Sequence, residues 1–364
     1  MSTWGERLRL SIFGGSHSRA IGVTMEGLPA GEFLHWEQVL IQMRRRAPGQ
    51  DKTATPRKES DLPDILSGID ENYMLTGDPV SACIYNGNQH SKDYESLRHT
   101  PRPGHADYPA YIKYHGKNDI RGGGHFSGRL TAPLVFAGAV CRQLLERRGI
   151  VIGAHVLSVG GVPDQPFDPV SVTPDELRRL SAHYFPVLSA GVKREMAERI
   201  TEARSCGDSL GGVVECAVLG LPVGLGTHMF GGVENVLSSI LFGIPAVKGI
   251  EFGKGFRVAE MTGSENNDSY CYDENGQLCT ETNHSGGVLG GMANGMPLVF
   301  RLAFKPTPSI ATAQPTVNLQ AQTNVQIAIK GRHDPCIVPR AAPAVEAAAA
   351  VAVCELMLRE GRLS

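Results

Sequence analysis

Two stretches of sequence decide the fold: LTAPLVFAGAVCRQLLERRG at residues 130–149 and APAVEAAAAVAVCELML at residues 342–358. In the first stretch, leucine, alanine and cysteine recur at helical spacing, and further apolar residues occupy the remaining faces. A helix that is apolar on every face is buried on every side. Thr131 is a candidate N-cap and Gly149 a stop signal. The second stretch has the same character, so we predict two fully buried helices.

Strand-like segments surround these helices, and several of them alternate in polarity and end at Gly or Pro. They lie at residues 8–12, 21–26, 80–85, 151–159, 213–219, 247–252, 298–304 and 325–329. A regular strand–helix alternation is missing, which favours an α+β fold over a doubly wound sheet. We therefore predict a helical layer between sheets. Amphipathic helices are expected at residues 36–46 and, on the surface, at 189–205. No repeat or long polar linker divides residues 1–364, which predicts a single domain.

Composition excludes several classes of protein. An apolar content of 41% in 364 residues argues against general disorder, and the net charge of −2 argues against bulk binding to nucleic acid or membranes. The eight cysteines have no C-x-x-C spacing, which predicts reduced thiols in a cytoplasmic protein. The N-terminus lacks a signal-peptide pattern, and the most apolar stretch, 341–353, is too short to span a bilayer. The 43 glycines indicate many loops, or backbone close to a ligand.

Four histidines stand in glycine-rich turns. The motifs are GGSH (14–17), RPGHAD (102–107), RGGGH (121–125) and GRHDP (331–335). Each turn could simply expose a solvated imidazole. A metal site is disfavoured because no helical histidine pair or Cys/His cluster occurs, and a serine hydrolase because G-x-S-x-G is missing. We interpret the four motifs together as a site for acid–base chemistry.

Arginines and glycines supply a second signal. Basic residues follow one another at 44–46, 52 and 57–58, and further arginines near Gly or Pro stand at 102, 121, 129, 332 and 340. The first group could be a solvated helix end, a nuclear-localisation signal or a nucleic-acid contact. The whole set instead favours a ligand with several anionic groups, because guanidinium groups clamp phosphates and carboxylates. KPTPS at 305–309 is either a plain turn or a cradle for a cofactor phosphate.

The motifs resemble those of the chorismate synthase family, in family order and over nearly the whole chain. They are GGSH (14–17), RRR (44–46) with PG (48–49), RPGHADYPAYIKYHGKNDIRGGG (102–124), GDSLGG (207–212), NHSGG (283–287), KPTPS (305–309) and GRHDPC (331–336). The resemblance implies a βαβ sandwich with helices between two antiparallel sheets, assembled as a homotetramer. It implies a carbon–oxygen lyase of the shikimate pathway, which removes phosphate from 5-enolpyruvylshikimate 3-phosphate by anti-1,4-elimination and requires reduced FMN. A flavin-dependent oxidoreductase acting on a phosphorylated substrate is the alternative.

The resemblance also implies residue roles. His17 would protonate the leaving phosphate, His105 would lie near flavin N1, and Asp334 would handle the proton at flavin N5. Substrate anions would be held by Arg45, Arg46, Arg102, Arg129 and Arg332. FMN would contact His125, Phe126, Ser127, Pro245, Ala246, Gly290, Lys305, Pro306, Thr307, Pro308, Ser309 and Arg332. The family's NADP positions are Arg45 and Lys52, and no metal is implied. The chain departs from the family pattern at Gly15, Ser18, Lys52, His125, Phe126, Leu130 and Pro245.

Overall fold

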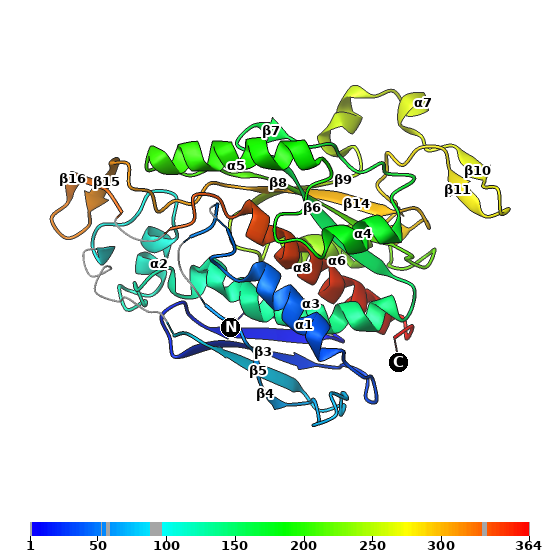
Figure 1. Cartoon of the computed structure of the whole chain (residues 1–364), viewed down its shortest axis with the longest axis horizontal. Helices are drawn as coiled ribbons and strands as arrows, with labels where there is room; N and C mark the ends of the chain where they lie inside the picture. The colour runs from blue at the N-terminus through cyan, green and yellow to red at the C-terminus, as the bar shows by residue number, and fades with distance from the viewer. Residues whose placement is uncertain (1, 52, 56–58, 88–96, 330–332, 364) are drawn as a thin grey trace.

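The computed structural model describes residues 2–51, 53–55, 59–87, 97–329 and 333–363. Two five-stranded antiparallel sheets form its outer layers, and helices lie between them (Figure 1). The first sheet has the order β1 (Ser2–Trp4), β2 (Arg9–Gly14), β3 (Ala20–Glu26), β5 (Val80–Tyr85) and β4 (Asp64–Ser67). The second has the order β7 (Val162–Pro163), β6 (Val151–Val159), β8 (Gly212–Leu219), β14 (Leu298–Phe304) and β9 (Val247–Phe252).

The helical layer contains α1 (Trp36–Arg46), α3 (Thr131–Glu146), α6 (Val233–Leu241) and α8 (Val338–Arg359). Helix α3 packs on the first sheet through β3 and β5, and α8 packs on the second through β6 and β8. Helices α4 (Pro174–Leu180) and α5 (Ala190–Ser205) contact β6, and α5 lies on the outer side of the second sheet (Figure 1). The predicted α+β sandwich with a buried helical layer is confirmed.

The two central helices approach each other closely at a glycine. A Cβ atom added to Gly138 of α3 would lie 2.2 Å from the Cα atom of Ala347 in α8. Only glycine therefore permits this contact, and the alanine run of α8 keeps the opposite surface equally small. Nearly every side chain of both helices is buried. This close contact explains why the two stretches lack a polar face.

Shorter elements complete the chain. The remaining α-helices are α2 (Asp107–Lys113) and α7 (Gly263–Asn266), and the 3₁₀ helices are η2 (Gly124–Phe126), η3 (Gly128–Leu130), η4 (Met229–Gly231) and η5 (Gly255–Glu260). Three two-stranded hairpins pair β10 (Tyr270–Tyr272) with β11 (Leu278–Thr280), β12 (Val288–Leu289) with β13 (Met292–Ala293), and β15 (Gln314–Asn318) with β16 (Thr323–Ile327). Of these elements, β16 corresponds to the strand predicted at residues 325–329. The others were not predicted, because they are too short for a periodic pattern.

Most predicted elements appear within two residues of their expected bounds, but one detail is wrong. The N-cap of α3 is Leu130, not Thr131, because the preceding η3 leads directly into the helix. The Thr131 hydroxyl instead donates to the Gly128 carbonyl at 2.6 Å and accepts from Arg46 Nε at 3.1 Å. The Thr131 side chain therefore holds the Arg46 guanidinium group in place and does not cap α3.

In the described part of the chain, one helix, α8, is long and apolar enough to span a membrane. Within its most apolar window, 94% of the residues are buried inside the protein. The helix also carries two buried carboxylates, Glu346 and Glu355. Its apolar composition is thus explained by its central position in the sandwich.

Candidate active site

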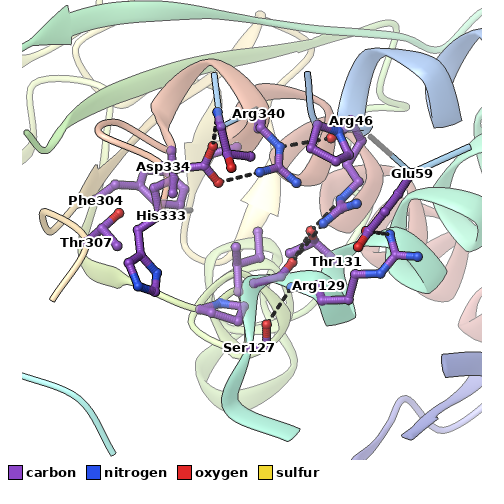
Figure 2. A pocket seen from close by; sticks show the side chains of 17 residues that line it. Arg46, Glu59, Ser127, Arg129, Thr131, Phe304, Thr307, His333, Asp334 and Arg340 are labelled. Carbon is purple, nitrogen blue, oxygen red and sulfur yellow. Dashed lines mark hydrogen bonds and ion pairs between the residues drawn. The ribbon is translucent and has the colours of Figure 1, made fainter. Parts of the chain in front are cut away.

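A cavity of about 210 Å³ lies where one end of the helical layer meets the second sheet. Its walls come from the end of α1, from the segment before α3, from the segment after α6, from the end of β14 and from the start of α8. The lining residues include Arg46, Glu59, Ser127, Arg129, Pro245, Thr307, His333, Asp334 and Arg340. Figure 2 shows the arginines on one side of the cavity, with His333 and Thr307 facing them across it.

Two buried arginines in the wall share one carboxylate. Asp61, which is 1% exposed, accepts from Arg46 Nη1 at 2.5 Å with one oxygen and from Arg129 Nη1 with the other. Burial alone would raise the pKa of Asp61, but Arg46 and Arg129 together lower it below its ordinary value. Burial lowers the pKa of Arg46 to about 10, so its guanidinium group is still charged at neutral pH. Arg129 also pairs with Glu59 at 3.0 Å.

Asp334 is held at the opposite end of the same wall. One carboxylate oxygen accepts from the Thr55 backbone N–H at 2.9 Å, and the other pairs with Arg340. Arg340 also donates from Nε to the Arg46 carbonyl at 3.1 Å, which ties α8 to the end of α1 (Figure 2). Burial lowers the pKa of Arg340, but the neighbouring acids, Asp334 first among them, raise it overall. Asp334 is therefore fixed in position beside a permanent cation.

Each arginine in the wall is paired with a carboxylate. Donor atoms that have no hydrogen-bond partner therefore determine whether the cavity can bind a further anion. Among the described residues, Arg129 Nη2 and the Thr307 hydroxyl are buried and have no hydrogen-bond partner. Both residues line the cavity. Buried donors without partners are costly, and an anionic oxygen would satisfy them. The cavity is thus suited to a phosphate or carboxylate.

A second group of polar residues surrounds Arg102, which is 5% exposed. Its guanidinium group donates to both oxygens of Asp107, at 2.7 and 2.8 Å. It also donates to the Gly122 carbonyl at 2.8 Å and the Ser309 hydroxyl at 3.2 Å. Asp107 accepts in addition from His105 Nδ1 at 2.6 Å. The Arg102 and His105 contacts lower the pKa of Asp107 despite its burial. Asp107 therefore orients the His105 ring and leaves Nε2 as its second proton site.

His17 lies against the glycine tract of residues 122–124. Gly122 has φ +64°, and a Cβ atom there would lie 2.4 Å from His17 Cε1. Ser16 fixes the ring from the other side, with its Oγ 3.1 Å from His17 Nδ1. The Gly123 N–H donates to Ser16 Oγ at 3.3 Å, and the Ser16 N–H donates to the Gly124 carbonyl at 3.0 Å. The glycines are thus needed for the close approach of the 14–17 turn.

The two groups are joined through the chain segments that they share. Gly122 contacts His17 and Arg102, while Ser127 and Arg129 of the same segment line the cavity. Residues 305–309 also connect the cavity with the group around Arg102, because Thr307 lines the cavity and Ser309 contacts Arg102. A second cavity of about 180 Å³ adjoins the first at His333 and Asp334 and is lined in part by Ser309. Asp334 therefore lines both cavities, whereas His17 and His105 line neither and are connected to them through residues 122–129 and 305–309.

Other predicted residues lie elsewhere. Arg45 is buried in a bidentate pair with Glu346, at 2.6 and 3.1 Å, and does not line the cavity. Gly290 is in the β12–β13 turn, and the exposed His125 lies beside Phe126 in η2, with its ring tilted 39° from the Phe126 ring. Pro306 is exposed, Lys305 donates to the Gly104 carbonyl at 3.0 Å, and Ala246 and Pro308 flank lining residues. Arg332 and Lys52 lie outside the described residues. The predicted ligand contacts of these residues stay predictions.

Sequence reasoning missed the acids that organise the site. Asp61 follows a basic loop and carries no motif, and its φ of +48° appears only in the structure. Asp107 lies inside the quoted RPGHAD motif, which was a usable signal. Arg340 was noted as an anion-binding candidate but was given no role. Within the described ranges, no group of three or more His, Cys, Asp or Glu side chains is placed to hold a metal ion.

Comparison with known proteins decides the family. The family model described as chorismate synthase matches residues 8–358. The chain belongs to the chorismate synthase family. Chorismate synthases from Thermococcus gammatolerans and Thermococcus kodakarensis are each 47% identical over 355 residues, covering 98% of this chain and 97% of the relative. A solved structure titled "Crystal Structure of Chorismate Synthase" matches with a TM-score of 0.75 and 27% identity, covering 98% of this chain and 93% of that one. The predicted family is thus confirmed.

Proposed function

We propose that this chain carries out the chorismate synthase reaction, in which 5-enolpyruvylshikimate 3-phosphate loses phosphate and a ring proton. A C–O bond breaks, and phosphate leaves with the electron pair. A ring C–H bond also breaks, and its electrons form the new double bond. The observation that carries the proposal is the cavity, where the buried Arg46 and Arg129 face the Thr307 hydroxyl, which has no hydrogen-bond partner within the described chain. Such a wall offers preorganised donors to a substrate with a phosphate and two carboxylates.

The residues at the cavity also fit FMN as the cofactor. An anionic group of the cofactor or of the substrate would satisfy the two buried donors, Arg129 Nη2 and the Thr307 hydroxyl, that lack partners within the described chain. Pro245 and Ser127 line the same cavity and would contact FMN from its sides. Bound in reduced form, FMN would supply electron density to the reacting ring without net redox change. His125 and Phe126, two of the predicted FMN contacts, are exposed and are also positions where the chain departs from the family pattern.

Three side chains would then manage protons. His17, oriented by Ser16 and wedged against Gly122, would donate a proton to the departing phosphate. His105 has Nδ1 bound to Asp107, so its ring is fixed with Nε2 as the exchanging atom. Asp334, anchored by Thr55 and Arg340, would hold or accept a proton at its carboxylate. A histidine titrating near neutrality is suited to such transfers.

The experiment is an anaerobic assay of phosphate release with reduced FMN and 5-enolpyruvylshikimate 3-phosphate. Phosphate release without net consumption of reduced flavin supports the lyase. Flavin oxidation in proportion to product would instead indicate an oxidoreductase acting on a phosphorylated substrate. A steeply salt-dependent affinity for nucleic acid, with no turnover, would favour the binding protein suggested by the basic residues at 44–58.

We also propose that the 1–364 domain works as a homotetramer in the cytoplasm. Support for assembly comes from an apolar patch around η4 and the β12–β13 hairpin, where Phe230 is 85% exposed. Other exposed members are Val223, Met229, Leu289 and Met292. Contiguous apolar patches of this kind are usually covered by another subunit. The eight free cysteines support a reducing compartment.

Sedimentation velocity tests the assembly. A tetramer is expected for the wild type, and Phe230→Asp should shift the protein to smaller species. An exposed glutamate elsewhere, Glu198→Gln, provides the control. A wild-type monomer at micromolar concentration would contradict the proposal.

A further inference from the structure

Cys271 and Cys279 face each other across the β10–β11 hairpin. They are directly opposite in the strand register, and their Sγ atoms are 3.3 Å apart. The Asp273 N–H donates to the Gln277 carbonyl and the Glu281 N–H to the Ser269 carbonyl, each at 2.9 Å. Because bonded and non-bonded pairs alternate, the cysteines form a hydrogen-bonded pair, with Cα atoms about 5.5 Å apart. Most protein disulfides span such a separation.

The pair is accessible to reagents. Both thiols are only partly buried, and the hairpin extends from the edge of the molecule (Figure 1). Tyr270, Tyr272 and Leu278 on the opposite hairpin face are 64%, 75% and 62% exposed. That face is open to solvent at these three residues, whereas Thr280 on the same face is 2% exposed and ties the end of the hairpin to Met296.

A second cysteine pair provides a contrast inside the same molecule. Cys354 Sγ lies 3.5 Å from the Cys141 carbonyl, but both residues are fully buried between α3 and α8. No dissolved oxidant reaches that pair while the protein is folded. Of the other cysteines, Cys206 is exposed and Cys83 partly buried, and neither is paired with a second thiol in the described structure. Cys271 and Cys279 thus lie close enough together to form a disulfide and are also within reach of a dissolved oxidant.

We propose that Cys271 and Cys279 form a reversible modification site, at which a cross-strand disulfide is made by exchange with a low-molecular-weight disulfide such as oxidised glutathione. One thiolate attacks the glutathione disulfide, forms a mixed disulfide and releases one glutathione thiolate. The second cysteine, after losing its proton, attacks the protein sulfur and releases the other glutathione. Two cysteine thiols are oxidised, and one glutathione disulfide is reduced to two thiols. The new bond prevents β10 and β11 from separating.

The surroundings of Cys271 slow attack by its thiolate near neutral pH. The hydrogen bond to Cys279 raises the pKa of Cys271, and the nearby carboxylates of Glu281 and Asp273 raise it further. Since the thiolate is the nucleophile, the rate should increase about tenfold per pH unit below that pKa. The pair is thus stable in reducing conditions and responds to sustained oxidation.

The test is alkylation mapping of the full-length reduced protein after equilibration in buffers of oxidised and reduced glutathione. After quenching with N-ethylmaleimide, peptide mass spectrometry should find the 271–279 pair short of two hydrogens and unalkylated. Reduction should restore both thiols. The proposal is overturned if both cysteines remain alkylated at the most oxidising ratio, or if each carries glutathione with no internal bond.

Single Cys→Ser variants distinguish a disulfide between Cys271 and Cys279 from nonspecific oxidation of accessible cysteines. Cys271→Ser and Cys279→Ser should each leave a stable glutathione adduct on the remaining cysteine, whereas Cys206→Ser should keep the internal disulfide. In urea, the ratio of internal to mixed disulfide should fall at least about tenfold, because the hairpin no longer aligns the thiols. An unchanged ratio in urea would overturn the role of the hairpin.

Discussion

Asp61 lies between Arg46 and Arg129 and accepts a hydrogen bond from each guanidinium group with a different carboxylate oxygen. All three side chains are almost fully buried. Removing one partner of a buried ionic group leaves uncompensated charge and costs about 3–5 kcal/mol. The position of the two arginines at the cavity therefore depends on this one acid.

Asp61→Asn should lower kcat/KM for the phosphorylated substrate about 10–100-fold, because the guanidinium groups lose their shared charge. Asparagine tolerates the positive φ of +48°, so the backbone is preserved. Steady-state kinetics measure the effect, and Asp64→Asn, an exposed acid of β4, is the matched control. Wild-type kinetics in Asp61→Asn would show that the arginines do not need this acid.

His105→Ala should lose most turnover while FMN still binds, because the ring lies beside Arg102 and Asp107 rather than in the main cavity. Loss of a general acid or base usually costs about 10²–10⁴-fold in rate. Turnover and flavin titration separate the two effects, and His228→Ala, an exposed histidine, is the control. Full activity in His105→Ala would refute the assigned role.

Asp334→Asn should likewise lose activity about 10²-fold or more. The amide oxygen can still accept from the Thr55 N–H, so the loop keeps its anchor while the carboxylate is lost. Single-turnover phosphate release is the measurement. Near-wild-type rates would mean that Asp334 is only a turn residue paired with Arg340.

Gly122→Ala should displace His17, since the new methyl group would lie 2.4 Å from its ring. The positive φ adds about 1–2 kcal/mol of backbone strain. We expect both a lower melting temperature and a loss of turnover. Gly191→Ala, in α5 with open space around it, should be neutral or stabilising by up to about 1 kcal/mol. A Gly122→Ala protein with normal turnover would contradict the packing of His17.

His155 should make stability depend on pH. Burial lowers its pKa, but the Asp164 carboxylate, 3.7 Å from Nδ1, and the Glu215 carboxylate, hydrogen-bonded to Nε2 at 2.9 Å, raise it overall. A raised pKa in the folded state stabilises the protein below the unfolded pKa of about 6.5, and this contribution is lost as pH rises through the folded pKa. His155→Gln should therefore cost about 3–5 kcal/mol in acid and progressively less in alkali. Urea unfolding at several pH values measures this, with His228→Gln as control. A cost independent of pH would exclude a charged His155.

The sequence by itself determined the elements and the family. Apolar residues on every face predicted the buried helices α3 and α8, and strand patterns located β2, β3, β5, β6, β8, β9 and β14, because these patterns report burial locally. The short strands β1, β4 and β7 were not predicted. Motifs in family order, such as GGSH and RPGHAD, identified His17 and His105 as candidate site residues.

Only the tertiary structure decided how the charges are paired. Arg45 and Arg46 are neighbours in sequence, yet Arg45 is paired with Glu346 in α8 and Arg46 with Asp61 at the cavity. Successive residues of a helix point about 100° apart, so adjacent arginines meet different layers of the sandwich. Their partners are set by packing between distant segments, which local sequence patterns do not contain.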